Sequence, residues 1–309
     1  MCLMVGYFSV VAQIKVQSPL NNIQHVTAAL TLPACGLDML LNEGRKDPTF
    51  QAAEEKMNAA IVRASRLLAD TIYTLPLVFH IVRQNPNSIT DQDILNEVKN
   101  LNDIFGKTGA FSSSAGADTK IRFCLARKDP DGGTTTGITR TQSFFGTNLE
   151  QLTEDERLKN LVQWDPSRYV NIWLVSNIVT ENLVRFGCGI WTRLGESGYA
   201  FLPVPQSKLD GIVVAGIGGS TLLAHEMGHY LGLYHTFEGL NCINNNCETD
   251  GDRVCDTPPD ASTGNSASCN SPSNSCSTDT PFQSLEWNFL NRRSGPDSQY
   301  NGLWKGRLS

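Results

Sequence analysis

The spacing of apolar residues changes along the chain and separates three kinds of segment. From Pro48 to Asp70 apolar residues recur every three or four positions, which predicts a helix within a segment covering residues 13–70. From Ile72 to Val82 the apolar run is nearly continuous, as in a buried strand. After residue 235 the chain is rich in Gly, Ser, Asn and Cys, which indicates irregular structure.

Predicted strands and helices alternate through the middle of the chain. A helix is expected over residues 89–105, where Thr90 and Asp93 form a start resembling a capping box. Short strands are predicted over residues 121–126, 169–175, 198–203 and 212–214, and a second helix follows the last of them. This order predicts an α/β (α+β) fold with helices backing a mixed sheet. Pro203 suits an edge strand, and such an edge can bind an extended peptide as one more strand.

Charge and length limit the possible partners. The chain has 309 residues, of which 40% are hydrophobic and 18% charged, so it can form an ordinary globular core. A net charge of −6 argues against nucleic acid or an anionic membrane as the main partner. The apolar residues 1–12 end in Val-Val-Ala and are a candidate signal peptide, although a buried strand would give the same pattern.

Cysteines concentrate in the irregular part of the chain. Five of the nine fall in one stretch, at Cys242, Cys247, Cys255, Cys269 and Cys276. A cysteine-only zinc site is the competing explanation, but the spacings contain no paired C-x-x-C. We therefore expect disulfide bonds, an oxidising compartment and a secreted protein.

The densest chemical pattern lies between His225 and His235 and fits H-E-x-x-H-x-x-G-x-x-H. His225 and His229 are one helical turn apart, so both imidazoles can reach one metal ion. Gly232 is expected to end the helix with a positive φ, which lets His235 return as a third ligand. Three protein nitrogens predict a catalytic zinc site, in which Glu226 serves as general base toward the attacking water.

Incidental histidines on an amphipathic helix are the alternative to a metal site. Bare H-E-x-x-H occurs by chance, but the longer pattern also fixes Gly232 and His235. Three of the five histidines of the chain lie in this stretch, which favours metal binding.

Several further segments resemble the pappalysin family of metzincin metalloproteases, in its secreted, microbial-type members. They are Leu75–His80, Thr136–Arg140, Val170–Trp173, Asp210–Val214 and Gly251–Pro259. The resemblance implies a zinc endopeptidase acting on proteins or peptides, with residues 71–309 as the catalytic domain. It also implies a cleft below a twisted mixed sheet, a small irregular disulfide-rich lower subdomain, and structural calcium, for which residues 250–256 are the candidate loop.

The family resemblance also gives residues 13–70 a role as a pro-segment. Cys35-Gly36 resembles the cysteine that precedes the catalytic domain in the family, where a thiolate can occupy the fourth zinc position and keep a zymogen inactive. A disulfide or a buried free thiol is the alternative reading of Cys35.

Two positions depart from the metzincin pattern. The turn below the zinc carries Leu290 where a methionine is expected and Arg292 where a tyrosine is expected. Leucine conserves the volume, but a lost phenolic donor near the oxyanion weakens catalysis. Two alternatives to a protease therefore stay open: a zinc-binding pseudoprotease, and an interaction module built on the Cys-rich tail.

Overall fold

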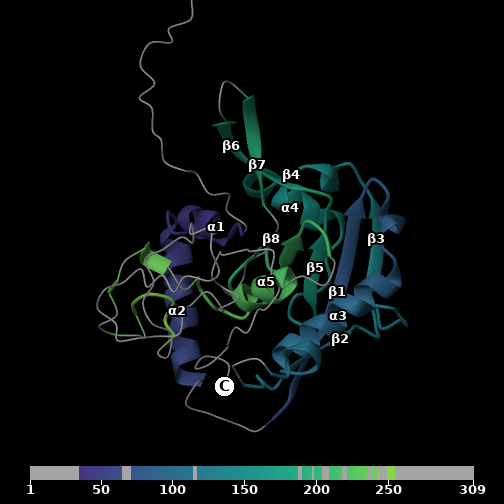
Figure 1. The fold of residues 1–309 in the computed structure, drawn as a ribbon, viewed down its shortest axis with the longest axis horizontal. Helices are drawn as coiled ribbons and strands as arrows, with labels where there is room; N and C mark the ends of the chain where they lie inside the picture. Colours follow the sequence, from purple (N-terminus) through teal and green to yellow (C-terminus); the bar gives the residue numbers. More distant parts are fainter. Residues whose placement is uncertain are drawn as a thin grey trace, which may run out of the picture. The chain divides into compact units, whose positions relative to one another are not determined.

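A mixed β-sheet forms the centre of the fold (Figure 1). The computed structural model of the protein describes residues 35–64, 71–113, 117–186, 190–196, 198–203, 209–217, 221–235, 238–240, 242–243, 246 and 249–254. Among these residues, six strands form one sheet in the order β2-β1-β5-β9-β8, with β3 also pairing with β1. The pairs are parallel except for β8, which runs antiparallel to β9 at the edge.

The described strands of the two sheets have the following bounds. They are β1 (Tyr73–Arg83), β2 (Ile121–Leu125), β3 (Ile138–Gln142), β4 (Leu149–Glu150), β5 (Val170–Leu174), β6 (Ile178–Phe186), β7 (Ile190–Glu196), β8 (Gly198–Ala200) and β9 (Ile212–Val214). Strands β4, β6 and β7 form a second, three-stranded sheet.

Two of the described helices precede the strands in the chain, two lie between strands, and α5 follows the last strand. The helices are α1 (Leu37–Gly44), α2 (Pro48–Ala64), α3 (Asp91–Phe105), α4 (Gln151–Leu161) and α5 (Leu222–Tyr230), with short 3-10 turns at Pro86–Ser88, Gly109–Phe111, Phe145–Thr147 and Glu238–Leu240. Within this described part, no helix is long and apolar enough to cross a membrane.

Strand β1 is central because it pairs along both of its edges. Its first half pairs with β2, its second half pairs with β3, and β5 pairs with Leu77–Ile81. Being flanked on both edges and covered on both faces explains why its sequence is apolar almost throughout.

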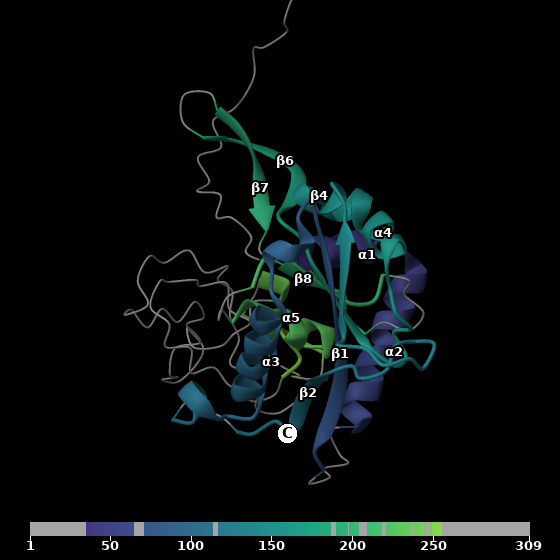
Figure 2. The same ribbon diagram turned by 90° about the vertical axis from the view of Figure 1, so that its right-hand side faces the viewer.

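Alternate residues of the strands face two different layers. Leu77, Phe79 and Ile81 pack with buried residues of α3 and α5, whereas Val82 packs with Trp173 and with Leu158 of α4. Figure 2 shows α3 on one side of β1 and α4 on the other. The sheet is therefore a middle layer, and α5 is held on the α3 side.

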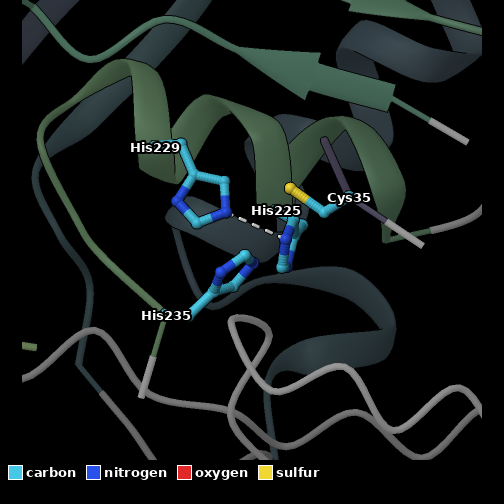
Figure 3. A group of neighbouring side chains, drawn as sticks. All are labelled: Cys35, His225, His229 and His235. Carbon is cyan, nitrogen blue, oxygen red and sulfur yellow. Dashed lines mark hydrogen bonds between the residues drawn. The ribbon is translucent and has the colours of Figure 1, made fainter. Parts of the chain in front are cut away.

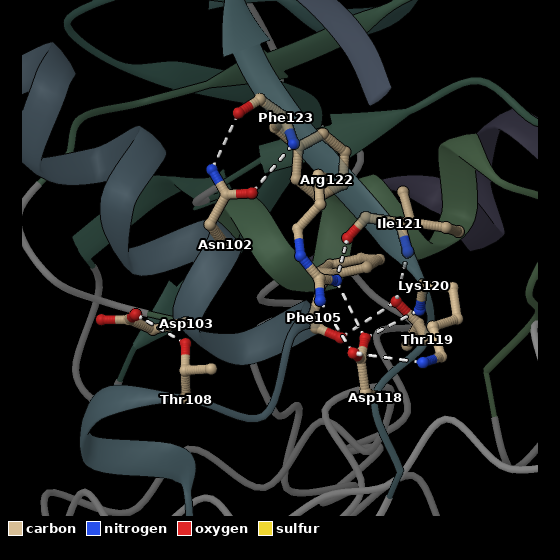
Figure 4. A network of polar contacts seen from close by, with 10 residues as sticks. All are labelled: Asn102, Asp103, Phe105, Thr108, Asp118, Thr119, Lys120, Ile121, Arg122 and Phe123. Atoms are coloured by element: carbon tan, nitrogen blue, oxygen red, sulfur yellow. Dashed lines mark hydrogen bonds and ion pairs between the residues drawn. The ribbon is translucent and has the colours of Figure 1, made fainter. Parts of the chain in front are cut away.

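Polar contacts fix the two ends of α3. At its start, the Thr90 hydroxyl accepts the Asp93 N–H and the Asp93 carboxylate accepts the Thr90 N–H, which is the predicted capping box. Near its end, the Asn102 amide donates to the Phe123 carbonyl and accepts the Phe123 N–H (Figure 4). These contacts tie α3 to β2 at the far end of the sheet from β8.

The predicted fold class is confirmed: a twisted mixed sheet is backed by helices. The predicted strands and helices are present, although the strand expected over 198–203 is limited to Gly198–Ala200. Helices α1 and α4 and strands β3, β4, β6 and β7 are additions that the sequence pattern does not predict.

The Cys-rich region lies largely outside the described residues. Cys242 is disulfide-bonded, whereas Cys247, Cys255, Cys269 and Cys276 fall among residues that the structure does not describe. The disulfide-rich lower subdomain and its pairing therefore stay predictions, as does the candidate signal peptide over residues 1–12.

Candidate metal centre

Helix α5 carries His225 and His229 on the face turned into the protein. The helix is held by apolar side chains, with Leu223, Ala224 and Met227 buried in the main core. Its first residue follows Thr221, whose side chain makes no capping hydrogen bond, so burial rather than a side-chain cap stabilises the helix. His229 has no exposed surface and His225 is 9% exposed.

Gly232 turns the chain back toward the helix, as predicted. Its φ is 96°, a conformation that L side chains rarely adopt. The Leu233 N–H donates to the Gly228 carbonyl and closes the turn at 3.0 Å. His235, three residues beyond Gly232, thereby reaches the other two histidines and is fully buried.

Four potential ligand atoms converge at this point. One nitrogen each of His225, His229 and His235 and the sulfur of Cys35 all lie within 4.8 Å of one another. Figure 3 shows the three rings facing a common centre, with Cys35 entering from a different part of the chain. Three imidazoles and one thiol form a donor set that fits a tetrahedral metal ion. In the described part of the chain, this is the one such cluster.

Hydrogen bonds to the outer ring nitrogens orient two of the imidazoles. The Nδ1–H of His229 donates to the Leu233 carbonyl at 2.7 Å, and the Nδ1–H of His235 donates to the Asp38 carboxylate at 2.7 Å. In each ring the Nε2 lone pair is then left for the common centre.

The surroundings of His229 and His235 favour the neutral form of these two rings, which metal binding requires. Burial, and then the neighbouring His225 and His235, hold the pKa of His229 well below its usual range. Burial also lowers the pKa of His235 to about 4.

Glu226 follows His225 and lies next to the cluster, fully buried. The Cys35 thiol donates to Glu226 Oε2 across 3.6 Å. A Cβ built on Gly198 would lie 3.1 Å from Glu226 Cγ, so β8 passes directly against this side chain. The carboxylate therefore stands between the ligand cluster and the edge of the sheet.

The N-terminal segment contacts the site along α1 and α2. Cys35 forms a parallel bridge with Gly198, and the Gly36 N–H donates to the Gly198 carbonyl at 2.9 Å. The buried side chains Cys35, Leu37, Leu41 and Met57 form one apolar cluster with Leu202 and Tyr234. The segment thus occupies the edge of β8 beside the metal cluster.

Ion pairs reinforce this docking. Arg45 contacts Glu54 at 2.6 Å within the segment and Glu238 at 2.7 Å in the loop after the third histidine. The Tyr234 hydroxyl donates to Glu54 at 2.8 Å. These contacts fasten α2 to the residue that precedes His235.

A second buried polar network supports β8 from α4. Asp155 accepts a hydrogen bond from the Tyr199 hydroxyl at 2.7 Å and pairs with Lys159 at 2.8 Å. Lys159 also donates to the Leu209 carbonyl. The next residue, Asp210, accepts a hydrogen bond from Tyr230 at the end of α5. Sequence reasoning missed this network, since Asp and Lys four apart on a helix usually lie on a solvated face.

Some sequence predictions cannot be placed. Leu290 and Arg292 lie outside the described residues. In the candidate calcium loop, Asp252 accepts the Val254 N–H and Asp250 accepts hydrogen bonds from Asn246 and Thr249, and nothing in these contacts supports a calcium ion.

Comparison with known sequences places this site in a family. The peptidase M43 family model, described as pregnancy-associated plasma protein-A, matches residues 153–294. An extracellular metalloprotease of Sordaria macrospora is 45% identical over 237 residues, which cover 75% of this chain and 71% of that protein. An extracellular metalloprotease of Pyricularia oryzae is 23% identical over 259 residues, which cover 76% of each chain.

Solved structures with the same fold agree with these relatives. A promirolysin variant of Tannerella forsythia matches with a TM-score of 0.65 at 25% identity, covering 89% of this chain and 91% of that one. Mature Tannerella forsythia mirolysin in complex with a cleaved peptide matches with a TM-score of 0.53 at 26% identity, covering 78% and 87%.

The sequence, the fold and the relatives thus agree, and the predicted protease activity and extracellular location are confirmed. The chain belongs to the pappalysin family of metzincins and is an extracellular metalloendopeptidase.

Proposed function

We propose that the protein is a zinc endopeptidase in which His225, His229 and His235 hold the ion and Glu226 is the general base. The observation that carries this proposal is the convergence of three imidazole nitrogens and a thiol within 4.8 Å. A set of imidazole nitrogens and one thiol sulfur is a donor set typical of zinc. The loop around residues 250–256 has no role in this proposal.

The chemistry divides between the ion and the protein. When bound, zinc supplies Lewis acidity that polarises the scissile carbonyl and makes water a nucleophile near neutral pH. Glu226 takes the proton of the attacking water and then gives it to the leaving amine. Its position beside the cluster and against Gly198 puts the carboxylate within reach of a peptide bond lying along β8.

The substrate is a protein or peptide that adds to the sheet at β8. Among the described residues this strand is the edge of the six-stranded sheet, and the missing side chain of Gly198 leaves room for Glu226 beside it. Pairing through backbone hydrogen bonds binds an extended chain without requiring one side-chain sequence. Mirolysin, which shares the fold, has been solved with a cleaved peptide bound, which is consistent with this kind of substrate.

The same edge explains how the protein is kept inactive before processing. Cys35 reaches the ligand cluster and bridges to Gly198, so residues 13–70 act as a pro-segment and residues 71–309 as the catalytic domain. The Cys35 sulfur then takes the fourth ligand position and excludes water from it. On this proposal, replacing Cys35 by alanine opens the fourth ligand position of the full chain to water, whereas replacing the exposed Cys124 by alanine changes nothing.

A zinc-binding pseudoprotease is the alternative, and the relatives named metalloproteases do not favour it. The decisive experiment measures hydrolysis of denatured casein together with zinc content after processing of the full chain. We expect Glu226→Gln to keep one zinc ion per chain and to lose hydrolysis at least a hundredfold. Glu97→Gln, at another buried glutamate, is the matched control and should keep both. Hydrolysis by the Glu226→Gln variant at the wild-type rate would refute the assignment.

A further inference from the structure

Asp38 makes a contact with the metal cluster that is distinct from the Cys35 contact. It lies in the first turn of α1, three residues after Cys35. Its Oδ1 atom accepts the Nδ1–H of His235 at 2.7 Å, across 197 positions of sequence. The His235 side chain has no exposed surface and the Asp38 side chain is 31% exposed, so the hydrogen bond lies at the boundary of the buried cluster.

The orienting groups of the cluster differ in chemistry and in origin. His229 donates its Nδ1–H to a backbone carbonyl only four residues away, at Leu233. His235 donates its Nδ1–H to a carboxylate, which carries a full negative charge and increases the electron density of the ring more than a carbonyl does. His229 therefore keeps its partner in every form of the enzyme, whereas the partner of His235 belongs to the N-terminal segment.

The position of Asp38 is fixed by the docking of its helix. Leu37 and Leu41, on either side of Asp38 in α1, are buried against Leu202 and Tyr234. Arg45, directly after α1, is ion-paired with Glu238, three residues beyond His235. The carboxylate is therefore held in place at both ends of its helix.

We propose that Asp38 is a positioning residue for His235, and that it raises the affinity of the precursor for the metal ion. The proposal rests on the assignment of His235 as a ligand. The segment then has two effects on the site. Cys35 occupies the fourth ligand position, and Asp38 makes His235, a ligand that the mature enzyme keeps, a stronger donor to the ion. Release of the segment removes the carboxylate and leaves the mature site with lower affinity for its ion.

The test is zinc affinity, measured on the full chain by competition with a chromophoric chelator. Loss of an outer carboxylate partner typically lowers metal affinity by about 10–100-fold, and we expect this loss in Asp38→Asn. Asp38→Glu should restore part of the affinity, because it keeps a carboxylate on the same helix. Glu43→Gln makes the same acid-to-amide change at an exposed position of α1 and should leave the affinity unchanged.

Two comparisons distinguish an effect of Asp38 on His235 from a displaced Cys35 sulfur and from a weakened fold. The effect of Asp38→Asn must persist in a Cys35→Ala background, since a loss caused only by a displaced sulfur would vanish there. Thermal unfolding of the metal-free chains, compared between Asp38→Asn and Glu43→Gln, shows whether the fold itself is weakened. Affinities of Asp38→Asn and Glu43→Gln within twofold of each other would overturn the proposal.

A measurement on the unaltered residue covers the case in which Asp38→Asn does not fold. In the full chain labelled with ¹⁵N-histidine, the His235 Nδ1–H should give a signal protected from solvent exchange, and a His235→Gln variant assigns it. Absence of this signal refutes the contact. If His235→Ala leaves zinc affinity unchanged, the ligand assignment itself fails. If His235→Ala abolishes binding and Asp38→Asn does not weaken it, only the role of Asp38 fails.

Discussion

Replacing Lys159 by methionine tests the buried network that supports the edge strand. Methionine keeps most of the chain length and removes the ammonium group. The Lys159 side chain is 1% exposed and that of Asp155 is 4% exposed, so the substitution leaves a carboxylate buried without its cation. It also removes the hydrogen bond to the Leu209 carbonyl and the contact of the ammonium with the Phe201 ring at 4.0 Å.

The expected magnitude follows from this burial. Removing one charged partner of a buried ion pair lowers the unfolding free energy by about 3–5 kcal/mol. For a domain of this size, 1 kcal/mol corresponds to roughly 2–4 °C in Tm, so Lys159→Met should lower Tm by about 6–20 °C. The Tyr199 hydroxyl still donates to Asp155 at 2.7 Å, which places the expected loss toward the lower end of that range.

The assay is thermal unfolding followed by calorimetry and circular dichroism, in a Glu226→Gln background that prevents self-cleavage. The matched control is Lys99→Met, because Lys99 pairs with Asp103 at the same four-residue spacing but is 72% exposed. An exposed pair contributes at most about 1 kcal/mol, so this variant should lose no more than a few degrees.

The second arm of the experiment is the double variant Lys159→Met with Asp155→Asn. The asparagine is neutral and still accepts the Tyr199 hydroxyl, so the double variant should regain most of the lost Tm. A decrease in Lys159→Met no larger than in Lys99→Met would refute the reasoning. So would a double variant as unstable as the single one, because the loss would then not come from an unpaired charge.

Three further predictions concern single residues outside the cluster's ligands. Burial lowers the pKa of His80 to about 4, against 6.5 in the unfolded chain. As the pH falls, the unfolded chain therefore binds a proton at His80 before the folded chain does. About 3 kcal/mol of unfolding free energy is lost between pH 6.5 and pH 4. Denaturant unfolding over this pH range should show that slope in the wild type and a flatter one in His80→Gln, and equal slopes would contradict it. Gly232→Ala places a Cβ on a residue with a φ of 96°, at 2.9 Å from the Cδ1 atom of Ile61. Calorimetry should show that the unfolding free energy falls by about 1–2 kcal/mol. An unchanged Tm would contradict this strain. Thr90→Ala removes the capping hydrogen bond of α3 and should lower the unfolding free energy by about 1 kcal/mol in denaturant titrations. Thr90→Ser keeps the hydroxyl and is the control. An equal loss in both variants would contradict the role of the cap.

Sequence patterns predict those features of the structure that are determined by residues close together in the chain. The apolar run of β1 and the capping box of α3 are visible in the sequence because both depend on residues close together. Gly232 is also predictable, since the return of His235 requires a tight turn. These features are sufficient to predict the fold class and the convergence of the three histidines.

Features that depend on distant partners escape such prediction for a physical reason. Helix α4 buries Asp155 and Lys159 on its inner face, so its sequence does not show an apolar stripe. The contact of Asp38 with His235 joins residues 197 positions apart, and no periodicity predicts such a pair. In the sequence Cys35 is recognised only through its resemblance to a family cysteine, with a disulfide or a buried free thiol as the alternative. The structure adds its burial beside Glu226.

The parallel bridge between Cys35 and Gly198 joins two parts of the chain that are synthesised far apart in time. Cys35 precedes Glu226 by 191 positions, which at roughly 5–20 residues per second is about 10–40 s of synthesis. The thiol is therefore present long before the helix and strand that bury it. Until the sheet forms, the thiol lacks the burial that shields it from oxidants and from other cysteines in the folded chain.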